Sequence, residues 1–198
     1  MSQRTHYPRF HVLNEKAAWD EHTRSIVTSR TTDVSPYRFL TGKEADALFL
    51  ICGLLVNDFS PDVLRFVVGH IDRTLYASTG EGQRQEGVPA AADLIRLGLQ
   101  ALDNCTKSNY YISFHALDRT AQKQLLQSVS GGTAHPQSEW KAVPQQPFFR
   151  KLMSLTVESY CSHPKVWSEI GYAGPAYPRG YVRAQLGQAD PWEARQEQ

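Results

Sequence analysis

Apolar residues recur at helical spacing through most of the chain, and the pattern is clearest between Pro147 and His163. The apolar positions of this segment, three or four residues apart around one face, are Phe149, Leu152, Met153, Val157 and Tyr160. Such a stripe is typical of an amphipathic helix. Pro147 suits the first helical position, where a backbone N–H has no partner, and Pro164 disfavours the helical conformation at His163. The pattern predicts a helix that starts near Phe148 and ends before His163.

Helix start signals also mark the first half of the chain. Thr41 and Glu44 have the spacing of a capping box, and the apolar run 45–56 follows them directly. Ser60 and Pro61 predict the next start, with Ser60 as N-cap and Pro61 at the first helical position. Two separate helices are therefore expected here.

Further signals extend this helical pattern. Pro89 opens an apolar-periodic segment, and Asp118 can cap a helix that ends at Gly131-Gly132. No strand pattern of real length appears. We therefore expect an all-α fold, an irregular helical bundle with long extended N- and C-terminal arms.

The ends of the chain differ from its middle. Residues 1–37 carry aromatic side chains among many charges and have weak helical periodicity, so we interpret them as an extended N-terminal arm. A disordered tail is the alternative interpretation. Residues 38–175 form the predicted helical domain, and residues 176–198 form a C-terminal tail that we expect to wrap a partner.

Composition fits a globular protein of one domain. The chain has 198 residues, 41% of them hydrophobic and 21% charged. Its formal net charge of +1 gives no general attraction to nucleic acid, so a nucleic-acid partner is not expected. Cys52, Cys105 and Cys161 stand far apart without a metal or haem spacing, and we expect them to be buried apolar residues.

The sequence lacks the spacings that common catalytic and metal sites require. None of the seven histidines pairs with another at i, i+4 beside a carboxylate, as a zinc site on a helix would need. Cys161 and His163 are two residues apart, and such positions do not face each other on a helix. The loop 78–87 contains G-x-G without the strand and lysine that accompany phosphate binding. We predict no catalytic, cofactor-binding or metal residues on this chain.

Aromatic and arginine residues near the C-terminus suggest an interface instead. They lie in irregular chain punctuated by glycine and proline, and tyrosine, tryptophan and arginine dominate interface hot spots. A tail packed back on its own bundle is the alternative, and Glu158 could equally be a solvent-exposed residue. The candidate partner-contacting residues are Trp19, Glu158, Trp167, Tyr172, Pro175, Tyr177, Arg179, Tyr181, Arg183 and Trp192.

Two motifs resemble a known family. The order FF-x-x-L-x-x-x-T-x-E-x-(aromatic)-x-x-x-P begins at Phe148, and W-x-x-I-G-Y-x-G-P begins at Trp167. Earlier, G-V-P at Gly87 precedes a helix that ends in G-L-x-x-L-D, and Phe114 begins F-x-x-L, followed by Q-x-x-L-L. Together these residues resemble the gluconate 2-dehydrogenase subunit 3 family.

The resemblance implies a role in an oxidoreductase complex. Members of this family are small helical subunits of sugar and sugar-acid dehydrogenases. Their large subunit is a flavoprotein of the glucose-methanol-choline type. The expected function is a non-catalytic small subunit that stabilises or matures this large subunit in a dehydrogenase acting on a sugar, glycoside or sugar acid. The resemblance places FAD on the partner and none on this chain, and a cytochrome c or another electron acceptor is a further implied partner.

The sequence leaves two other functional classes open, and it also leaves the cellular location open. A stand-alone helical enzyme would use an unrecognised site, and a helical nucleic-acid-binding module would show salt-dependent binding. Residues 1–24 contain neither a twin arginine nor an apolar signal core, and no apolar run reaches 18 residues. We expect no direct membrane insertion and a cytoplasmic location, with periplasmic co-export on a signal-bearing partner as the alternative.

Overall fold

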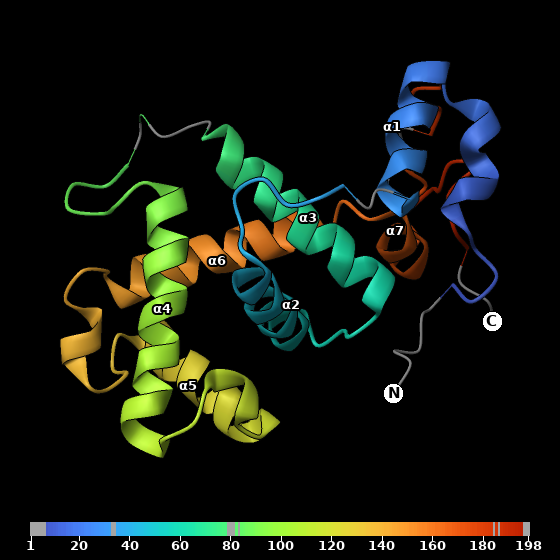
Figure 1. Ribbon diagram of the computed structural model, residues 1–198. Helices are drawn as coiled ribbons and strands as arrows, with labels where there is room; N and C mark the ends of the chain where they lie inside the picture. Colours follow the sequence, from blue (N-terminus) through green and yellow to red (C-terminus); the bar gives the residue numbers. More distant parts are fainter. Residues whose placement is uncertain are drawn as a thin grey trace. The chain divides into compact units, whose positions relative to one another are not determined.

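The computed structural model describes residues 7–32, 35–78, 82, 84–183, 185 and 187–195 (Figure 1). In these ranges the regular secondary structure is α-helix and 3-10 helix, without a strand, so the all-α prediction is confirmed. The chain divides into two compact units. The larger one is Ser35–Ser159, and the smaller one combines described residues from Met1–Val34 with those from Tyr160–Gln198.

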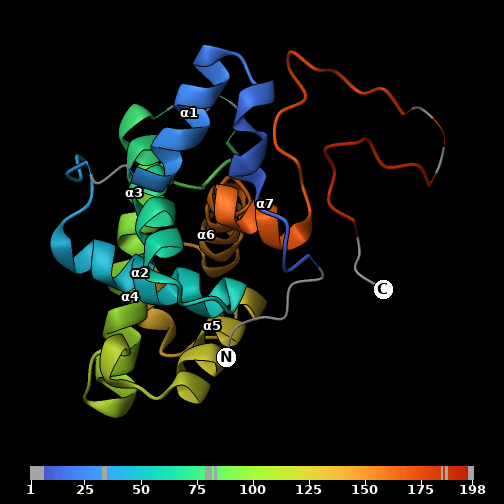
Figure 2. The same ribbon diagram turned by 90° about the vertical axis from the view of Figure 1, so that its right-hand side faces the viewer.

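In its described residues, 35–78, 82 and 84–159, the larger unit is a bundle of five α-helices and two short 3-10 helices. Figures 1 and 2 show how the α-helices are arranged. The elements are α2 (Gly42–Val56), α3 (Pro61–Ala77), α4 (Ala91–Tyr110), η3 (Phe114–Ala116), α5 (Arg119–Gly131), η4 (Gln137–Trp140) and α6 (Gln145–Tyr160). Helix α2 packs against α3, and α4 packs against both of them and against the two 3-10 helices. The three-part division into arm, domain and tail describes how the chain would engage a partner and stays a prediction.

Local signals account for the helix starts in this unit. The Thr41 hydroxyl accepts a hydrogen bond from the Glu44 N–H, and the Glu44 carboxylate accepts one from the Thr41 N–H at 2.7 Å, which is the predicted capping box. The Asp118 carboxylate likewise accepts bonds from the first turn of α5. Ser60 precedes α3 as predicted, but its side chain makes no capping bond.

The crossing of α4 and α6 depends on a glycine. A Cβ on Gly98 would lie well inside contact distance of the Phe148 ring, so the two helices approach closely there. Trp140 also packs against Phe148, with the two ring centroids 5.9 Å apart, and its indole N–H donates to Cys105 Sγ at 2.9 Å. Both aromatic side chains are buried in this arrangement.

Helix α6 begins earlier than the sequence predicted. It starts at Gln145 rather than near Phe148, so Pro147 lies at its third position. Proline is tolerated there because backbone N–H groups of the first turn have no intrahelical acceptor. Gln145 is fixed by its side-chain amide, which exchanges two hydrogen bonds of 2.9 Å with the backbone of Ala134.

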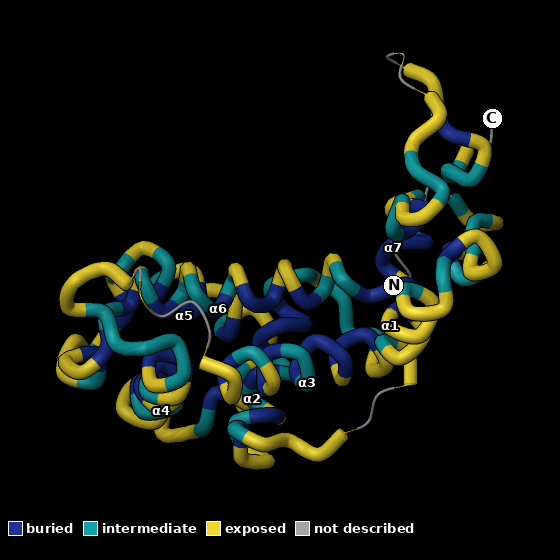
Figure 3. The backbone as a smooth tube through the Cα atoms, turned by 90° about the horizontal axis from the view of Figure 1, so that it is seen from above, coloured by how far each residue is buried: buried dark blue, intermediate teal, exposed yellow. Residues whose placement is uncertain are grey.

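The smaller unit contains η1 (Val12–Ala18), α1 (Glu21–Thr32) and α7 (Pro164–Ile170). The N-terminal segment was expected to be extended, but its described residues include the helices η1 and α1. Asp20 provides the missing start signal, because its carboxylate accepts from the N–H and the hydroxyl of Thr23 at 2.9 and 2.7 Å. The described residues after Ala173 form turns and irregular chain that are mostly exposed (Figure 3), as expected of a C-terminal arm.

Helix α7 was not predicted from the sequence. Its N-cap is His163, whose ring nitrogen accepts from the Lys165 N–H, and Pro164 occupies the first helical position. The same His163-Pro164 pair therefore ends one helix and starts another. Cys161 in the intervening turn is exposed, so the expectation of three buried cysteines holds only for Cys52 and Cys105.

Candidate functional site

Two of the predicted partner-contacting residues form the core of the smaller unit. Trp19 is 2% exposed and Trp167 is 6% exposed, and both cluster with Val12 and Val27. Phe10 and Leu13 pack against this cluster, which we call the tryptophan core. Trp19 and Trp167 are therefore enclosed by their own chain, which takes them out of reach of a partner in this conformation.

Trp167 is held from several directions. Its indole N–H donates to the Cys161 carbonyl at 2.6 Å, and the ring of Tyr172 meets its ring edge-on at a centroid distance of 5.3 Å. The guanidinium of Arg30, on α1, lies 5.4 Å from the ring centroid and donates to the Ser162 carbonyl. Arg30 was missed in the sequence, because nothing local links it to Trp167.

The glycines of the I-G-Y-x-G-P motif shape the contact between the ends of the chain. Gly171 and Gly174 both have positive φ, at 78° and 82°. A Cβ on Gly171 would lie 2.5 Å from the Tyr7 ring, and one on Gly174 would lie 2.6 Å from the Trp19 ring. The motif therefore serves the packing of the N-terminal segment against the residues that follow α7.

Three other predicted residues remain on the surface. Tyr172 is 42% exposed, Tyr177 is 71% exposed and Tyr181 is 73% exposed, and we call these three the C-terminal tyrosine surface. Partial burial raises the pKa of the Tyr172 phenol, and the nearby phenol of Tyr181 adds to the rise, while Arg179 and Arg30 oppose it. Tyr172 therefore stays neutral at physiological pH, and this surface offers aromatic area with hydroxyl groups at its edge.

Arg179 and Trp192 pair with each other within the tail. The Arg179 guanidinium carbon lies 4.8 Å from the centroid of the Trp192 ring, and its Nη2 donates to the Ala173 carbonyl at 2.6 Å. Asp190 is buried and closes the tail, since its carboxylate accepts from the N–H groups of Val182 and Arg183 at 3.0 and 2.8 Å. The remaining candidate in the tail, Pro175, is half-buried, and the side chain of Arg183 is exposed.

Helix α6 carries the last predicted residue, Glu158. Its side chain is exposed and accepts a hydrogen bond from the Ser154 hydroxyl at 2.6 Å. Thr156 is buried and donates to the Leu152 carbonyl at 2.7 Å, with its hydroxyl 3.3 Å from Cys52 Sγ. Thr156 is therefore satisfied inside the chain, whereas a role for Glu158 in partner contact stays a prediction.

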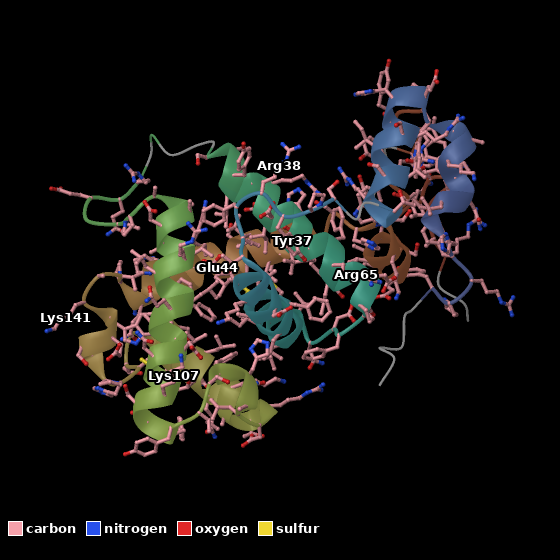
Figure 4. The ribbon with its side chains drawn as sticks, viewed as in Figure 1. Tyr37, Arg38, Glu44, Arg65, Lys107 and Lys141 are labelled. Atoms are coloured by element: carbon pink, nitrogen blue, oxygen red, sulfur yellow. The ribbon has the colours of Figure 1, made fainter. Side chains whose placement is uncertain are left out.

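The larger unit has a groove of about 590 Å³ beside α2, α4 and η3. Its apolar lining includes Ile51, Leu102 and Phe114, and its polar lining includes the ion pair of Arg96 and Glu44 at 2.8 Å. Figure 4 labels Glu44 where it stands on α2. Burial alone would raise the pKa of Glu44, but hydrogen bonds from Arg96 and Thr41 outweigh it and hold the pKa below its usual value. Such a groove suits recognition of apolar surface.

Exposed apolar residues at the end of α4 were also missed in the sequence. Tyr110, Tyr111 and Ile112 are all exposed, and Tyr111 ends the helix in a left-handed conformation with φ of 60°. The sequence signal that could have revealed this exposed surface was the run of three consecutive large side chains at the end of a helix.

No group of three or more potential metal ligands lies together in the described part of the chain. Within the same residues no single helix has the length and hydropathy of a membrane span, and α2 with α3 does so only as a pair bent by 115°.

The fold and these surfaces define a small all-α protein in which the ends of the chain form a compact unit with exposed tyrosines. The family model of gluconate 2-dehydrogenase subunit 3 matches residues 60–174, more than half of the chain, so this protein belongs to that family. The resemblance found in the sequence motifs is thereby confirmed. No curated protein and no solved structure matches the chain.

Proposed function

We propose that this chain is the non-catalytic small subunit of an FAD-dependent dehydrogenase acting on a sugar, glycoside or sugar acid. Its family is that of a dehydrogenase subunit, which supports a place in such a complex. The partner is a flavoprotein large subunit of the glucose-methanol-choline type, which carries the FAD and performs the oxidation. The small subunit stabilises or matures it, and a cytochrome c or another electron acceptor receives the electrons. The proposed compartment is the cytoplasm, with co-export to the periplasm as the alternative.

The observation that carries the proposed interaction is the exposure of the C-terminal tyrosine surface. Tyr177 and Tyr181 lie in a tail whose base, at Gly174, packs against Trp19 of the tryptophan core. A fixed base reduces the conformational entropy that binding must remove, and tyrosine gives large contact area with few rotatable bonds. Rigidly supported, exposed tyrosines are typical of an interface hot spot.

Co-expression with the flavoprotein encoded by a neighbouring reading frame tests the proposal. The expected result is a yellow complex in which an affinity tag on this chain retains both proteins at a fixed ratio, with flavin absorbance and sugar-dependent dye reduction. Expression of the flavoprotein alone should give less soluble, flavin-loaded protein. Two proteins that elute separately, with a flavoprotein equally soluble and active by itself, would contradict the proposal.

Paired substitutions locate the contact. Tyr177→Ser combined with Tyr181→Ser should weaken the complex by at least about tenfold, because hot-spot tyrosines contribute about 2 kcal/mol or more. Tyr111→Ser is the matched control, since Tyr111 is 91% exposed but lies in the larger unit. The control should bind as the unsubstituted chain does. Unchanged binding by the paired variant would place the interface elsewhere, and equal weakening by both variants would show that the loss is not specific to the C-terminal tyrosine surface.

A further inference from the structure

Arg179 combines a buried position with unused hydrogen-bonding capacity. Its side chain is 8% exposed, and its Nε and Nη1 are buried without a hydrogen-bond acceptor. The carboxylate of Glu15 comes within 3.8 Å of Nη1, which is within ion-pair range but too long for a hydrogen bond. Only Nη2 is satisfied, by the Ala173 carbonyl. A buried cation in this state is unusual, because desolvated donors are normally paired.

The unpaired atoms in this part of the molecule share one chemical character. In the described residues of the smaller unit, the buried side-chain atoms without a partner are Nε and Nη1 of Arg179 and Nε1 of Trp19. All three are N–H donors. They lie near one turn, because the Trp19 ring contacts Gly174 and Arg179 bonds to the adjacent Ala173. Among the described residues, no acceptor lies within hydrogen-bond distance of these three donors, and a guanidinium most strongly favours a carboxylate.

The surroundings of Arg179 favour a protein ligand. Burial lowers the pKa of the Arg179 guanidinium, while Glu15 and then Tyr172 oppose the shift. A guanidinium in a protein is effectively always charged. Tyr172 and Tyr181 lie close enough to interact with Arg179 electrostatically, and both are exposed. A cation with exposed aromatic side chains near it matches the centre of an interface hot spot, where the surrounding contacts exclude water.

We propose that Arg179 is the charged anchor of the C-terminal tyrosine surface, and that the partner subunit presents an aspartate or glutamate carboxylate to its Nε and Nη1. Apolar side chains next to this carboxylate would cover Tyr177 and Tyr181. The Trp192 ring, 4.8 Å from the guanidinium, moves aside or becomes part of the contact. This inference rests on the proposed function, because it names the chemistry by which the flavoprotein recognises this chain.

Substitution of Arg179 in the full chain, with binding to the co-expressed flavoprotein as readout, tests the inference. Arg179→Gln should raise the Kd by about 30-fold or more, because it leaves a partner carboxylate buried and unpaired. Arg179→Lys keeps the charge but loses the planar fork, and should raise the Kd by at least about tenfold. Arg195→Gln is the control, since Arg195 is an exposed arginine of the same tail that is not among the predicted partner-contacting residues, and it should change the Kd less than about threefold.

Thermal unfolding of the free chain separates recognition from internal packing. If the donors serve a partner, Arg179→Lys should lower the Tm of the free chain by no more than about two to four degrees, the cost of about 1 kcal/mol for the lost bond from Nη2 to the Ala173 carbonyl. An unchanged Kd for both Arg179 variants, or a loss of Tm that accounts for the weaker binding, would overturn the inference. So would an ordered water accepting from Nε and Nη1 in a crystal of the complex. If the unsubstituted chain does not bind the flavoprotein, the proposed function fails too, whereas normal binding by both variants overturns only this inference.

Discussion

The indole of Trp19 lies against the backbone of Gly174, so closely that a Cβ at position 174 would approach Cζ2 of the ring to 2.6 Å. Gly174 also has a φ of 82°, a conformation that disfavours every residue with a Cβ. Two separate physical requirements therefore demand glycine at this position. The motif near the end of the chain is matched to a residue near its beginning.

Gly174→Ala should destabilise the protein by about 2–5 kcal/mol, which combines backbone strain of about 1–2 kcal/mol with overpacking of about 1–3 kcal/mol. Gly187→Ala is the matched control, because Gly187 has a φ of 80° but no atom within 4 Å of its Cβ position. The control should show the backbone strain alone. Urea unfolding of the full chain measures both, and equal costs for the two variants would contradict the contact with Trp19.

The helices of the larger unit were predictable because their signals are local. Thr41, Glu44 and Asp118 each lie within four residues of the backbone groups that they cap, so spacing along the chain was sufficient. The buried stripes of α3 and α4 were likewise visible as helical periodicity. The start of α6 was misplaced because its anchor, Gln145, depends on a distant backbone segment at Ala134.

The smaller unit was not predictable because its contacts join the two ends of the chain. Trp19 and Trp167 each appeared to lie in sequence too irregular to bury them, and neither segment reveals the other as its packing partner. The exposure of Tyr177 and Tyr181 agrees with the pattern that suggested an interface, since glycine and proline around them prevent a helix. Arg179 was selected from its residue type, but its unpaired donors follow only from three-dimensional packing.

Gly98→Ala should destabilise the larger unit even though alanine favours helices. The gain in helix propensity is about 1 kcal/mol, whereas the new methyl group would collide with the Phe148 ring and force α4 and α6 apart. We expect a net loss of about 1–3 kcal/mol. Gly69→Ala is the control in α3, where the nearest atom to the Cβ position is 3.6 Å away on the flexible Arg73 side chain. This control should raise the free energy of unfolding by about 0.5–1 kcal/mol, measured by thermal or urea unfolding. A stabilising Gly98→Ala would show that the helices do not touch at this point.

Asp72→Asn should cost about 2–4 kcal/mol of stability. The Asp72 side chain is buried, and its two oxygens accept from the N–H groups of Arg38, Phe39 and Leu40 at 2.8–2.9 Å. An amide has one acceptor oxygen, so at least one of these N–H groups would lose its partner and the remaining bonds would lose charge assistance.

Asp93→Asn, at an exposed position in the first turn of α4, is the control and should cost less than about 1 kcal/mol. Chemical denaturation compares the two. Hydrogen exchange at residues 38–40 should increase in the first variant alone, and unchanged protection there would refute the role of Asp72.

The Glu44 carboxylate should make stability depend on pH in the acid range. Because Arg96 and Thr41 hold its pKa in the folded state below the ordinary value of 4.5, the unfolded chain binds the proton more readily. The contribution of Glu44 is therefore fully present above the unfolded pKa and is lost as the pH falls through the folded pKa. Glu44→Gln should lower the Tm at pH 6, and the difference from the unsubstituted protein should shrink steadily towards pH 3. Arg96→Gln, which removes the ion pair at 2.8 Å, should show the same trend, and the double variant should lose less than the sum of the two. A Tm difference for Glu44→Gln that is constant from pH 6 to pH 3 would mean that the carboxylate charge contributes nothing to the fold.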